Sequence, residues 1–267
     1  MNVDAVYSLR QADSPLLVSI PHSGTALDPS MRGRITEEAL RLADTDWHVD
    51  RLYSFLDERS ISVLKANYSR YVIDLNRPAD GAPLYPGQDE TGLCPVSSFS
   101  GKPLYLPGQD PDKDEISDRI GRYWEPYHDA LLNQLQAIKK KYGYVILWDA
   151  HSIRSEVPRF FEGTLPDLNF GTSSGATCDQ ALSDALVAMG RASDYSTVIN
   201  QRFRGGYITR QYGKPSEQIN AIQLELAQCN YMDELSFSYR EVLAANLQVV
   251  LASLVDTVVS YKPAYLS

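Results

Sequence analysis

Short apolar runs alternate along the chain with segments in which apolar residues recur at helical spacing. Five runs predict β-strands: 16–20, 61–66, 71–75, 144–148 and 219–226. The first and fourth contain at most one polar residue, which is typical of strands buried on both faces of a sheet. In the last run, Ile222, Leu224 and Leu226 share one face, so Gln223 and Glu225 point to the opposite one.

The segments between these strands predict helices. Four are expected: one that begins at Thr36, one from Asp44 to about Arg59, one over about 114–142 and one over about 243–258. Asp44 is the expected N-cap of the second helix, which places Asp46 in the first turn with its side chain free. Pro263 follows the last helix. Strands that alternate with helices predict an α/β fold, with a mixed, mostly parallel sheet flanked by helices.

One segment interrupts this alternation. Residues 78–111 are rich in proline and glycine, have no helical period and contain a near-repeat, 83–89 and 103–110. Loops of this length in compact domains serve as lids or binding loops, and the aromatic content of this one favours a packed loop or lid over disorder. No shift in composition marks a domain boundary, so we expect a single domain over residues 1–267.

Composition and charge exclude several classes of protein. The 267 residues carry a formal net charge of −9, which opposes non-specific binding to nucleic acid and to anionic lipid. The three cysteines are widely spaced, the N-terminus lacks a signal-peptide pattern, and no apolar run approaches about 18 residues. We therefore expect a cytoplasmic protein with no nucleic-acid or membrane partner. A chain of this length does not need a metal to hold its fold, so any metal would serve chemistry.

Two of the four histidines follow buried strands. His22 comes two residues after the run 16–20, and His151 three residues after the run 144–148. Because ligands bind at the carboxyl ends of strands in open α/β sheets, both side chains can converge on one crevice. A catalytic zinc site takes three protein ligands and a water molecule. The spacing alone supports two interpretations about equally: a zinc site, and a pair of histidines that only form hydrogen bonds.

The third ligand has several candidates, namely Asp44, Asp46, His48, Asp50 and Asp149. Asp149 lies two residues before His151 on a strand, so their side chains share a face. That position suits a carboxylate that supports a ligand from behind rather than a ligand itself. Asp46, in the first turn of the expected helix, is free to face the site.

Arginines in this acidic chain indicate a small anionic substrate. Asn76 and Arg77 follow a predicted strand, and a guanidinium matches a carboxylate in a two-point contact. The alternative is a salt bridge that closes the strand. A second basic segment combines two glycines with Arg202, Arg204 and Arg210. It fits either a binding loop for a dianion, since glycine allows close backbone approach, or a solvated hairpin.

Glu225 is the candidate for proton transfer. A carboxylate in a strand flanked by core residues has a raised pKa if it is half-buried, which suits a general base. The alternative is a solvent-facing glutamate on an amphipathic strand. The sequence has no dinucleotide-binding or P-loop glycine pattern and no HExxH, which sets those enzyme classes aside.

Five segments occur in a familiar order: Leu17-Val-Ser-Ile-Pro-His-Ser-Gly24, Asp44-Thr-Asp-Trp47, Tyr68-Ser-Arg-Tyr-Val-Ile-Asp-Leu-Asn-Arg-Pro78, Trp148-Asp-Ala-His-Ser-Ile153 and Gln223-Leu-Glu225. Together they resemble the N-formylglutamate amidohydrolase family over about residues 16–235. Residues 200–213 resemble its deformylase branch. The family is itself distantly similar to the zinc carboxypeptidases, which implies a zinc-carboxypeptidase-like fold.

The resemblance implies one zinc ion per chain, held by His22, an acidic residue and His151, with Co²⁺ as a possible substitute. It also implies that Glu225 is the general base. Carboxypeptidases carry their acidic ligand three residues after the first histidine, where this chain has Thr25, so we assign that role to Asp46.

The implied reaction is the hydrolysis of N-formyl-L-glutamate to formate and L-glutamate, in histidine degradation. The resemblance implies that Asn76 and Arg77 hold one substrate carboxylate, and we expect Arg154, Arg204 or Arg210 to hold the other. One alternative is a zinc amidohydrolase or carboxypeptidase-like enzyme for another N-acylated acidic amino acid or a short peptide. Another is a non-catalytic protein that binds an acidic metabolite. The oligomeric state is left open.

Overall fold

A single seven-stranded sheet organises the protein. The computed structural model describes residues 5–84 and 87–263. The strands are β1 (Tyr7–Arg10), β2 (Leu16–Ile20), β3 (Ser62–Ala66), β4 (Val145–Ile153), β5 (Leu168–Gly171), β6 (Thr197–Ile199) and β7 (Ile219–Ala227). Their order in the sheet is β1-β3-β2-β4-β7-β5-β6. The pairs β1–β3 and β5–β7 are antiparallel and the other four are parallel, which confirms the mixed, mostly parallel sheet.

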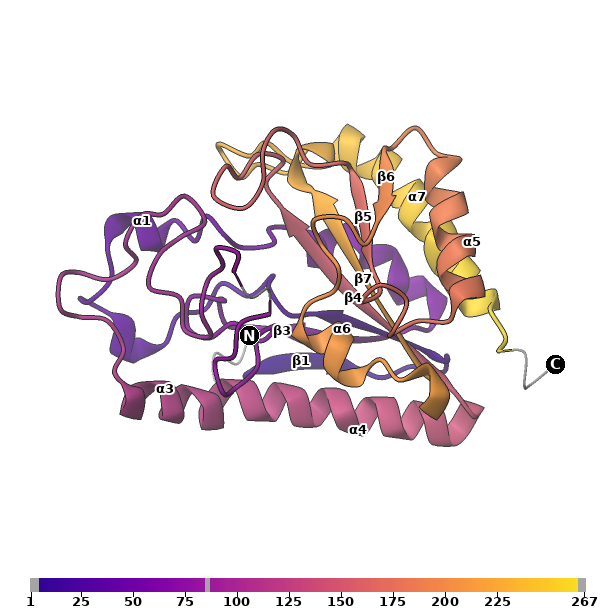
Figure 1. The fold of residues 1–267 in the computed structure, drawn as a ribbon, viewed down its shortest axis with the longest axis horizontal. Coiled ribbons are helices and arrows are strands. Elements are labelled where there is room, and N and C mark those ends of the chain that lie inside the picture. The colour runs from indigo at the N-terminus through magenta and orange to yellow at the C-terminus, as the bar shows by residue number, and fades with distance from the viewer. Residues whose placement is uncertain (1–4, 85–86, 264–267) are drawn as a thin grey trace.

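Helices cover both faces of this sheet (Figure 1). They are α1 (Glu37–Leu40), α2 (Val49–Leu52), α3 (Lys113–Arg119), α4 (Glu125–Tyr142), α5 (Gln180–Arg191), α6 (Tyr207–Tyr212) and α7 (Glu241–Ser260). A π-helix at 120–124 joins α3 to α4, so the predicted long helix is confirmed, as is the last one. Short 3-10 helices lie at 29–31, 54–59, 215–217 and 228–230.

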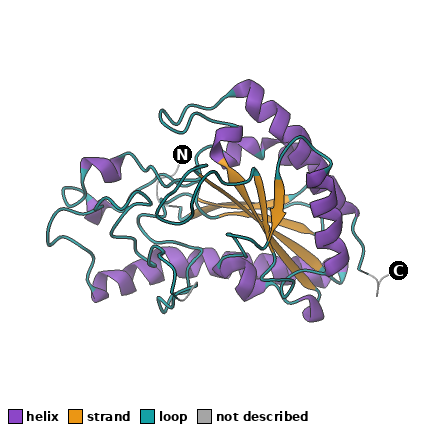
Figure 2. Cartoon of the chain, turned by 45° about the horizontal axis from the view of Figure 1, so that its top comes forward, coloured by secondary structure: helices purple, strands orange, loops and turns teal. Residues whose placement is uncertain are grey.

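Alternation along the strands creates two cores. On one face, Val18 and Trp148 pack with apolar residues of α2, α5 and α7. On the other face, Leu17 and Leu147 pack with α4. Figure 2 shows the strands between these helices and the loops gathered at one end of the molecule. Polar residues that share the face of Leu147 and lie nearer the carboxyl end of the strand therefore point toward the α4 side.

The predicted strand 71–75 is wrong. Its residues form turns, with the amide of Val72 donating to the carbonyl of Ser69 at 2.9 Å and that of Arg77 to Asp74 at 3.1 Å. The apolar side chains Tyr71, Val72, Ile73 and Leu75 are buried in the core on the α4 side. The hydrophobic run thus reflects the burial of an irregular segment, not a strand.

The predicted helix from Asp44 to Arg59 is only partly present. The α-helical turn α2 begins at Val49, after His48 in the left-handed region with φ 63°, and 54–59 is a 3-10 helix. Asp44 is not the N-cap, because its Oδ2 accepts the amide of Phe99 at 2.8 Å. Thr36 does cap α1, through the amide of Ala39 at 3.2 Å.

The loop 78–111 is packed where it is described, and contains no helix or strand there. Leu93, Cys94, Leu104 and Tyr105 are buried in the core on the α4 side. Residues 85 and 86, which belong to the near-repeat, lie outside the described residues. Movement of this loop as a lid stays a prediction.

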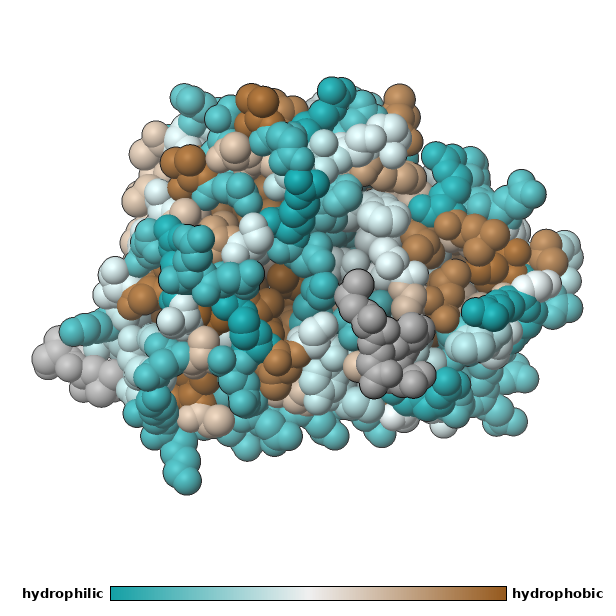
Figure 3. All heavy atoms as spheres, turned by 180° about the vertical axis from the view of Figure 1, so that it is seen from behind, coloured by the Kyte–Doolittle hydropathy of each residue, from teal (hydrophilic) through white to brown (hydrophobic). Residues whose placement is uncertain are grey.

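The last helix, α7, is long and apolar enough to cross a membrane by length and composition alone. Core helices of globular domains share those features. Six of its side chains are buried in the core with α5 and the sheet: Ala244, Leu247, Leu251, Leu254, Val255 and Val258. On the face of the molecule seen in Figure 3, apolar side chains stand in separate groups among hydrophilic ones.

Candidate metal and substrate site

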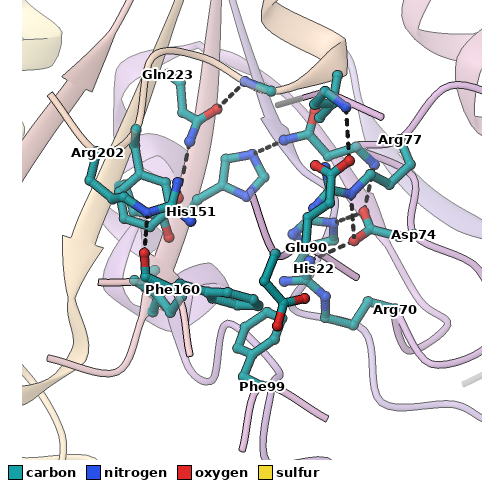
Figure 4. A pocket seen from close by; sticks show the side chains of 18 residues that line it. His22, Arg70, Asp74, Arg77, Glu90, Phe99, His151, Phe160, Arg202 and Gln223 are labelled. Carbon is teal, nitrogen blue, oxygen red and sulfur yellow. Dashed lines mark hydrogen bonds and ion pairs between the residues drawn. The ribbon is translucent and has the colours of Figure 1, made fainter. Parts of the chain in front are cut away.

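A polar pocket lies where β2, β4 and β7 end on the α4 side (Figure 4). His22 follows β2, His151 lies near the end of β4, and Glu225 lies near the end of β7. The sequence placed His151 just beyond its strand, but β4 continues to Ile153. In the parallel register of β4 and β7, His151 stands directly beside Glu225. This register brings a candidate ligand and a candidate base together.

Three buried side chains form a group that can hold a metal ion: His22, Asp46 and His151. One ligand atom from each lies within 4.8 Å of the others. Asp46 Oδ2 is 3.2 Å from His151 Nδ1 and 3.8 Å from His22 Nδ1. The three residues are 3%, 1% and 2% exposed, in chain order. Of the five candidates for the third ligand, Asp46 is therefore the one that the fold brings to both histidines in this group.

Asp46 reaches the site without a regular helix behind it. Its backbone amide donates to the carbonyl of His22 at 3.1 Å, which fixes the two segments side by side. Its Oδ2 also accepts the backbone amide of Ser152 at 3.0 Å. The acidic ligand is thus held by the two strand ends that carry the histidines.

The outer nitrogen of each histidine faces a different carboxylate. His22 Nε2 lies within hydrogen-bond distance of Asp74 Oδ1, at 2.7 Å. His151 Nε2 lies 2.9 Å from Asp149 Oδ2 in an ion pair, and its hydrogen-bond contact is with Asn76 Nδ2. A carboxylate behind a histidine fixes the ring and its tautomer, leaving the lone pair of the other nitrogen for a metal. His22 Nδ1 is buried and has no hydrogen-bond partner. This nitrogen faces the Asp46 carboxylate and the second imidazole. Two imidazole nitrogens and a carboxylate oxygen are ligands that a divalent ion such as zinc prefers.

Asp149 therefore occupies the supporting position that the strand pattern assigned to it. Its other oxygen, Oδ1, accepts a hydrogen bond from Ser19 Oγ at 3.1 Å. The hydroxyl of Tyr127 on α4 lies 3.0 Å from the same Ser19 oxygen. This buried chain ties His151 to the helix that covers the sheet.

The two histidines have opposite pKa shifts. Burial is the largest influence on His22 and, with the nearby Arg70 guanidinium, lowers its pKa. Burial opposes the charged form of His151 as well, but the carboxylates of Asp149 and Asp46 outweigh it and raise the pKa of that ring.

Glu225 is buried beside these histidines, so the solvent-facing alternative is wrong. It is 6% exposed, and its Oε2 accepts a hydrogen bond from Gln223 Nε2 at 3.0 Å. Burial raises the pKa of Glu225 to about 8, against the opposing charge of His151. A carboxyl group that titrates near neutrality can both accept and return a proton.

Three arginines also line the pocket, with Arg202 across from the other two in Figure 4: Arg70, Arg77 and Arg202. Arg70 is held by Asp74 at 2.6 Å and lies 3.7 Å from Asp46. Its guanidinium also stacks over the ring of Phe99, 4.7 Å from the centroid. Arg202 donates to the carbonyl of Phe160 at 2.7 Å. These cations make the pocket suitable for an anionic ligand despite the net charge of the chain.

Asn76 also lines the pocket, held in place by its own contacts. Its Oδ1 accepts the amide of Ile208 at 2.8 Å, at the start of α6. Its Nδ2 lies 3.1 Å from His151 Nε2. The side chain therefore links α6 to the metal-ligand group.

The other three arginines of the expected set are not among the described residues that line this pocket. Arg154 lines a neighbouring cavity with Asp44 and Phe99. Arg204 is exposed and donates to the carbonyl of Gln201 at 3.4 Å. Arg210 donates to the carbonyls of Gly205 and Leu84, at 2.8 Å each.

Arg70 and Gln223 were not expected in the site from the sequence, and Arg202 was expected only as part of the basic segment with Arg204 and Arg210. Arg70 stands inside the motif 68–78, and Gln223 shares its strand face with Glu225, so these positions could have indicated a place in the site. Arg202 stands two residues from Arg204 in a loop with no periodic pattern. Only the folded structure shows that Arg202 lines the pocket and that Arg204 does not.

Comparisons with known proteins show the family of the chain. The sequence model of the family described as N-formylglutamate amidohydrolase matches residues 14–232. Proteins named N-formylglutamate deformylase from Pseudomonas aeruginosa and Pseudomonas putida are 48% and 47% identical over 261 residues. These alignments cover 97% of this chain, and 98% and 97% of the relatives.

Solved structures show the same fold. The crystal structure of N-formylglutamate amidohydrolase from Ralstonia eutropha JMP134 superposes with a TM-score of 0.83 and 26% identity, covering 95% of this chain and 97% of that one. A gene product from Agrobacterium tumefaciens superposes with a TM-score of 0.72 and 18% identity, over 96% of this chain and 97% of that one. At that identity, the second likeness concerns the fold alone.

Proposed function

The chain belongs to the N-formylglutamate amidohydrolase family, and on that premise we propose that it hydrolyses N-formyl-L-glutamate to formate and L-glutamate. The observation that carries the proposal is a single pocket that joins a metal-ligand group, the buried carboxyl of Glu225 and three guanidinium groups. Hydrolysis of the amide bond uses the metal-ligand group and the base, and the guanidinium groups bind the two carboxylates of the substrate. The names of the Pseudomonas relatives support the same substrate.

We assign the metal to His22 and His151 through their Nδ1 atoms and to Asp46 through its carboxylate. When bound, a zinc ion supplies Lewis acidity toward the formyl carbonyl and acidifies water. Co²⁺ accepts similar ligands and is the natural replacement to test. The roles of Asp74 and Asp149 are to hold the two rings in the ligating tautomer.

Glu225 is the proposed general base. It takes a proton from the water that attacks the formyl carbon and returns it to the nitrogen of glutamate as the carbon–nitrogen bond breaks. The products are formate and the free amino acid, so atoms and charges balance. Its position beside His151 in the strand register keeps the carboxyl next to the ligand group throughout.

Arg70, Arg77 and Arg202 are the proposed anion holders. Arg70 is the one nearest Asp46, so its charge stabilises the oxygen of the formyl group as negative charge develops there. Arg77 and Arg202 then bind the two carboxylates of the substrate. Arg202 thus has the role that we expected from the sequence for Arg154, Arg204 or Arg210.

A role at the end of histidine degradation and a cytoplasmic location belong to the same proposal. The role in histidine degradation rests on the resemblance to the family, and the location rests on the composition of the chain. The expected partner is a small dianion, and the net charge of −9 argues against a nucleic acid or a membrane.

Formate release tests the proposal directly. Purified protein is assayed with N-formyl-L-glutamate as isolated, after chelation, and after zinc or cobalt is added back, with bound metal measured in each sample. We expect activity to fall with the metal and to return with it. N-Acetyl-L-glutamate is the matched control, because one extra methyl group crowds the acyl carbon. Tight binding of the substrate without turnover in metal-loaded protein would favour the non-catalytic alternative.

A further inference from the structure

Phe99 separates the metal and substrate pocket from a second cavity. Of the residues that the structure describes, it alone lines both. The second cavity has a volume of about 240 Å³. Its lining includes the apolar side chains of Ala43, Val157, Pro158, Leu235 and Phe237. Phe99 therefore stands between the reacting groups and a space that an apolar chain can fill.

The ring of Phe99 is held in one position. The backbone amide of the residue donates to Oδ2 of the buried Asp44 at 2.8 Å. The ring meets that of Phe160 edge-on, with the centroids 5.0 Å apart, and belongs to one apolar cluster with Ile153 and Val157. Phe99 is 8% exposed. Because closely packed side chains leave little free space around them, this ring forms a fixed wall of the pocket.

This wall lies beside the reacting groups (Figure 4). The guanidinium of Arg70 lies over the Phe99 ring, 4.7 Å from its centroid, and 3.7 Å from Asp46 of the metal-ligand group. The proposed function places the oxygen of the formyl group next to Arg70. The carbon bonded to that oxygen then lies near Phe99 as well. A formyl carbon carries only a hydrogen atom there, whereas every larger acyl group carries an alkyl chain.

We infer that Phe99 is a specificity-determining residue: its ring fills the space beside Arg70 that the alkyl chain of a larger acyl group would occupy. This inference rests on the proposed function. A larger acyl group binds only if the packed ring moves, and a close-packed core resists such movement. Without the ring, the chain gains a path into the second cavity. One methylene group in an apolar site typically changes kcat/KM by about 10- to 200-fold.

The test removes the wall and measures discrimination between acyl groups. Phe99→Ala and Phe99→Leu are compared with the wild type on N-formyl-, N-acetyl- and N-butyryl-L-glutamate, with release of L-glutamate as the common readout. The ratio of kcat/KM between two acyl groups cancels any loss that affects all substrates, such as weaker support of Arg70. Phe237→Ala is the matched control, because Phe237 lines the second cavity but not the pocket. It removes the same ring without opening the wall.

In Phe99→Ala we expect kcat/KM for N-butyryl-L-glutamate, relative to N-formyl-L-glutamate, to rise about tenfold or more. In Phe99→Leu we expect the larger gain for N-acetyl-L-glutamate, because leucine still fills part of the space. Phe237→Ala keeps the wild-type ratios. Unchanged ratios in the Phe99 variants overturn the inference, because the ring would then only support Arg70. An equal gain in Phe237→Ala overturns it too, since the wall would not be what excludes the chain.

Thermal unfolding shows whether each variant is folded. Phe99→Leu keeps an apolar side chain in the cluster. It therefore carries the test on its own if Phe99→Ala does not fold.

Calorimetric binding separates this inference from the proposed function. Glu225→Gln, with and without Phe99→Ala, is titrated with N-butyryl-L-glutamate and N-formyl-L-glutamate, because removal of the proposed base leaves both ligands intact. We expect the double variant to bind the butyryl compound about tenfold more tightly than Glu225→Gln does, with a smaller change for the formyl compound. Formate release by the wild type without this gain overturns the inference alone. The gain without formate release overturns the proposed reaction and leaves the role of Phe99 standing, and absence of both overturns both.

Discussion

Asp74 Oδ1 lies 2.7 Å from the Nε2 atom of His22. Both groups are buried, and the contact leaves His22 Nδ1 pointing at Asp46 without a hydrogen bond of its own. Asp74 thus determines which nitrogen of the ring is available. The relationship predicts that metal affinity depends on a residue that does not itself touch the metal.

The first prediction concerns that affinity. In Asp74→Asn we expect zinc to bind roughly 10- to 100-fold more weakly, and in Asp149→Asn by a similar factor. Competition with a chromophoric chelator measures the affinity. Asp44→Asn is the control, because Asp44 is a buried carboxylate that accepts the amide of Phe99 instead of supporting a histidine. Equal losses in all three variants would show a general effect of buried charge.

The second prediction concerns proton transfer. Glu225→Gln keeps the size of the side chain and removes the base, so kcat should fall by about 10²- to 10⁴-fold. Bound zinc, measured in the same samples, should remain near the wild-type level, since Glu225 lies outside the ligand group. A variant that retains activity, or one that loses its zinc, contradicts the assigned role.

The third prediction distinguishes the arginines. Arg202→Ala should raise KM and lower kcat/KM by about 10²-fold, because a buried pocket loses one of the charges that holds the substrate. Arg77→Ala should act similarly. Arg204→Ala should leave kinetics near the wild-type values, since this side chain is exposed and outside the pocket lining. A larger effect at Arg204 than at Arg202 would return the binding role to Arg204, one of the three arginines expected from the sequence.

The fourth prediction concerns the free energy of unfolding and pH. Burial lowers the pKa of His128 to about 4. The ring lies 2.9 Å from both the carbonyl of Leu75 and the hydroxyl of Tyr212. Between pH 6.5 and 4 the unfolded chain binds a proton here that the folded chain does not, so stability falls as the pH falls.

The expected loss from this group is about 2–3 kcal/mol between pH 7 and pH 4.5. Urea unfolding of metal-free wild type and His128→Gln at both pH values measures it. Glutamine also donates and accepts a hydrogen bond but does not titrate, so its stability should change less over this range. Parallel curves for the two proteins would mean that His128 is protonated in the folded state.

The sequence predicted the parts of the site that depend on strand periodicity. The apolar runs located β2, the first part of β4 and nearly all of β7, and the two-residue repeat placed Asp149 with His151 and Gln223 with Glu225. Parallel pairing then brought these side chains together. Nothing beyond strand position was needed to expect a shared site.

Features that depend on tertiary contacts were not predictable in the same way. Asp44 was expected to cap a helix, but its carboxylate accepts the amide of Phe99 from a distant loop instead. The run 71–75 is apolar because a core covers it, and turns bury it as well as a strand would. Loops have no periodic pattern, so the roles of Arg202 and Arg204 could not be separated.

The paired glycines of the basic segment illustrate the same limit and give the last prediction. The sequence indicated close approach of a ligand, but at Gly206 the close neighbour is Asn76. A Cβ at Gly206 would stand 2.2 Å from Asn76 Nδ2 and 2.6 Å from its Oδ1. Gly206→Ala should therefore displace Asn76, which lies beside His151 and accepts the amide of Ile208.

Overpacking of this kind typically costs about 1–3 kcal/mol of stability, and here we expect an increase in KM as well, because the displaced side chain lines the substrate pocket. Gly92→Ala is the control, since a Cβ there meets nothing within 4 Å. Thermal unfolding and formate-release kinetics on both variants separate the two effects. Destabilisation of Gly206→Ala with an unchanged KM would show that Asn76 maintains the fold at this point without positioning substrate.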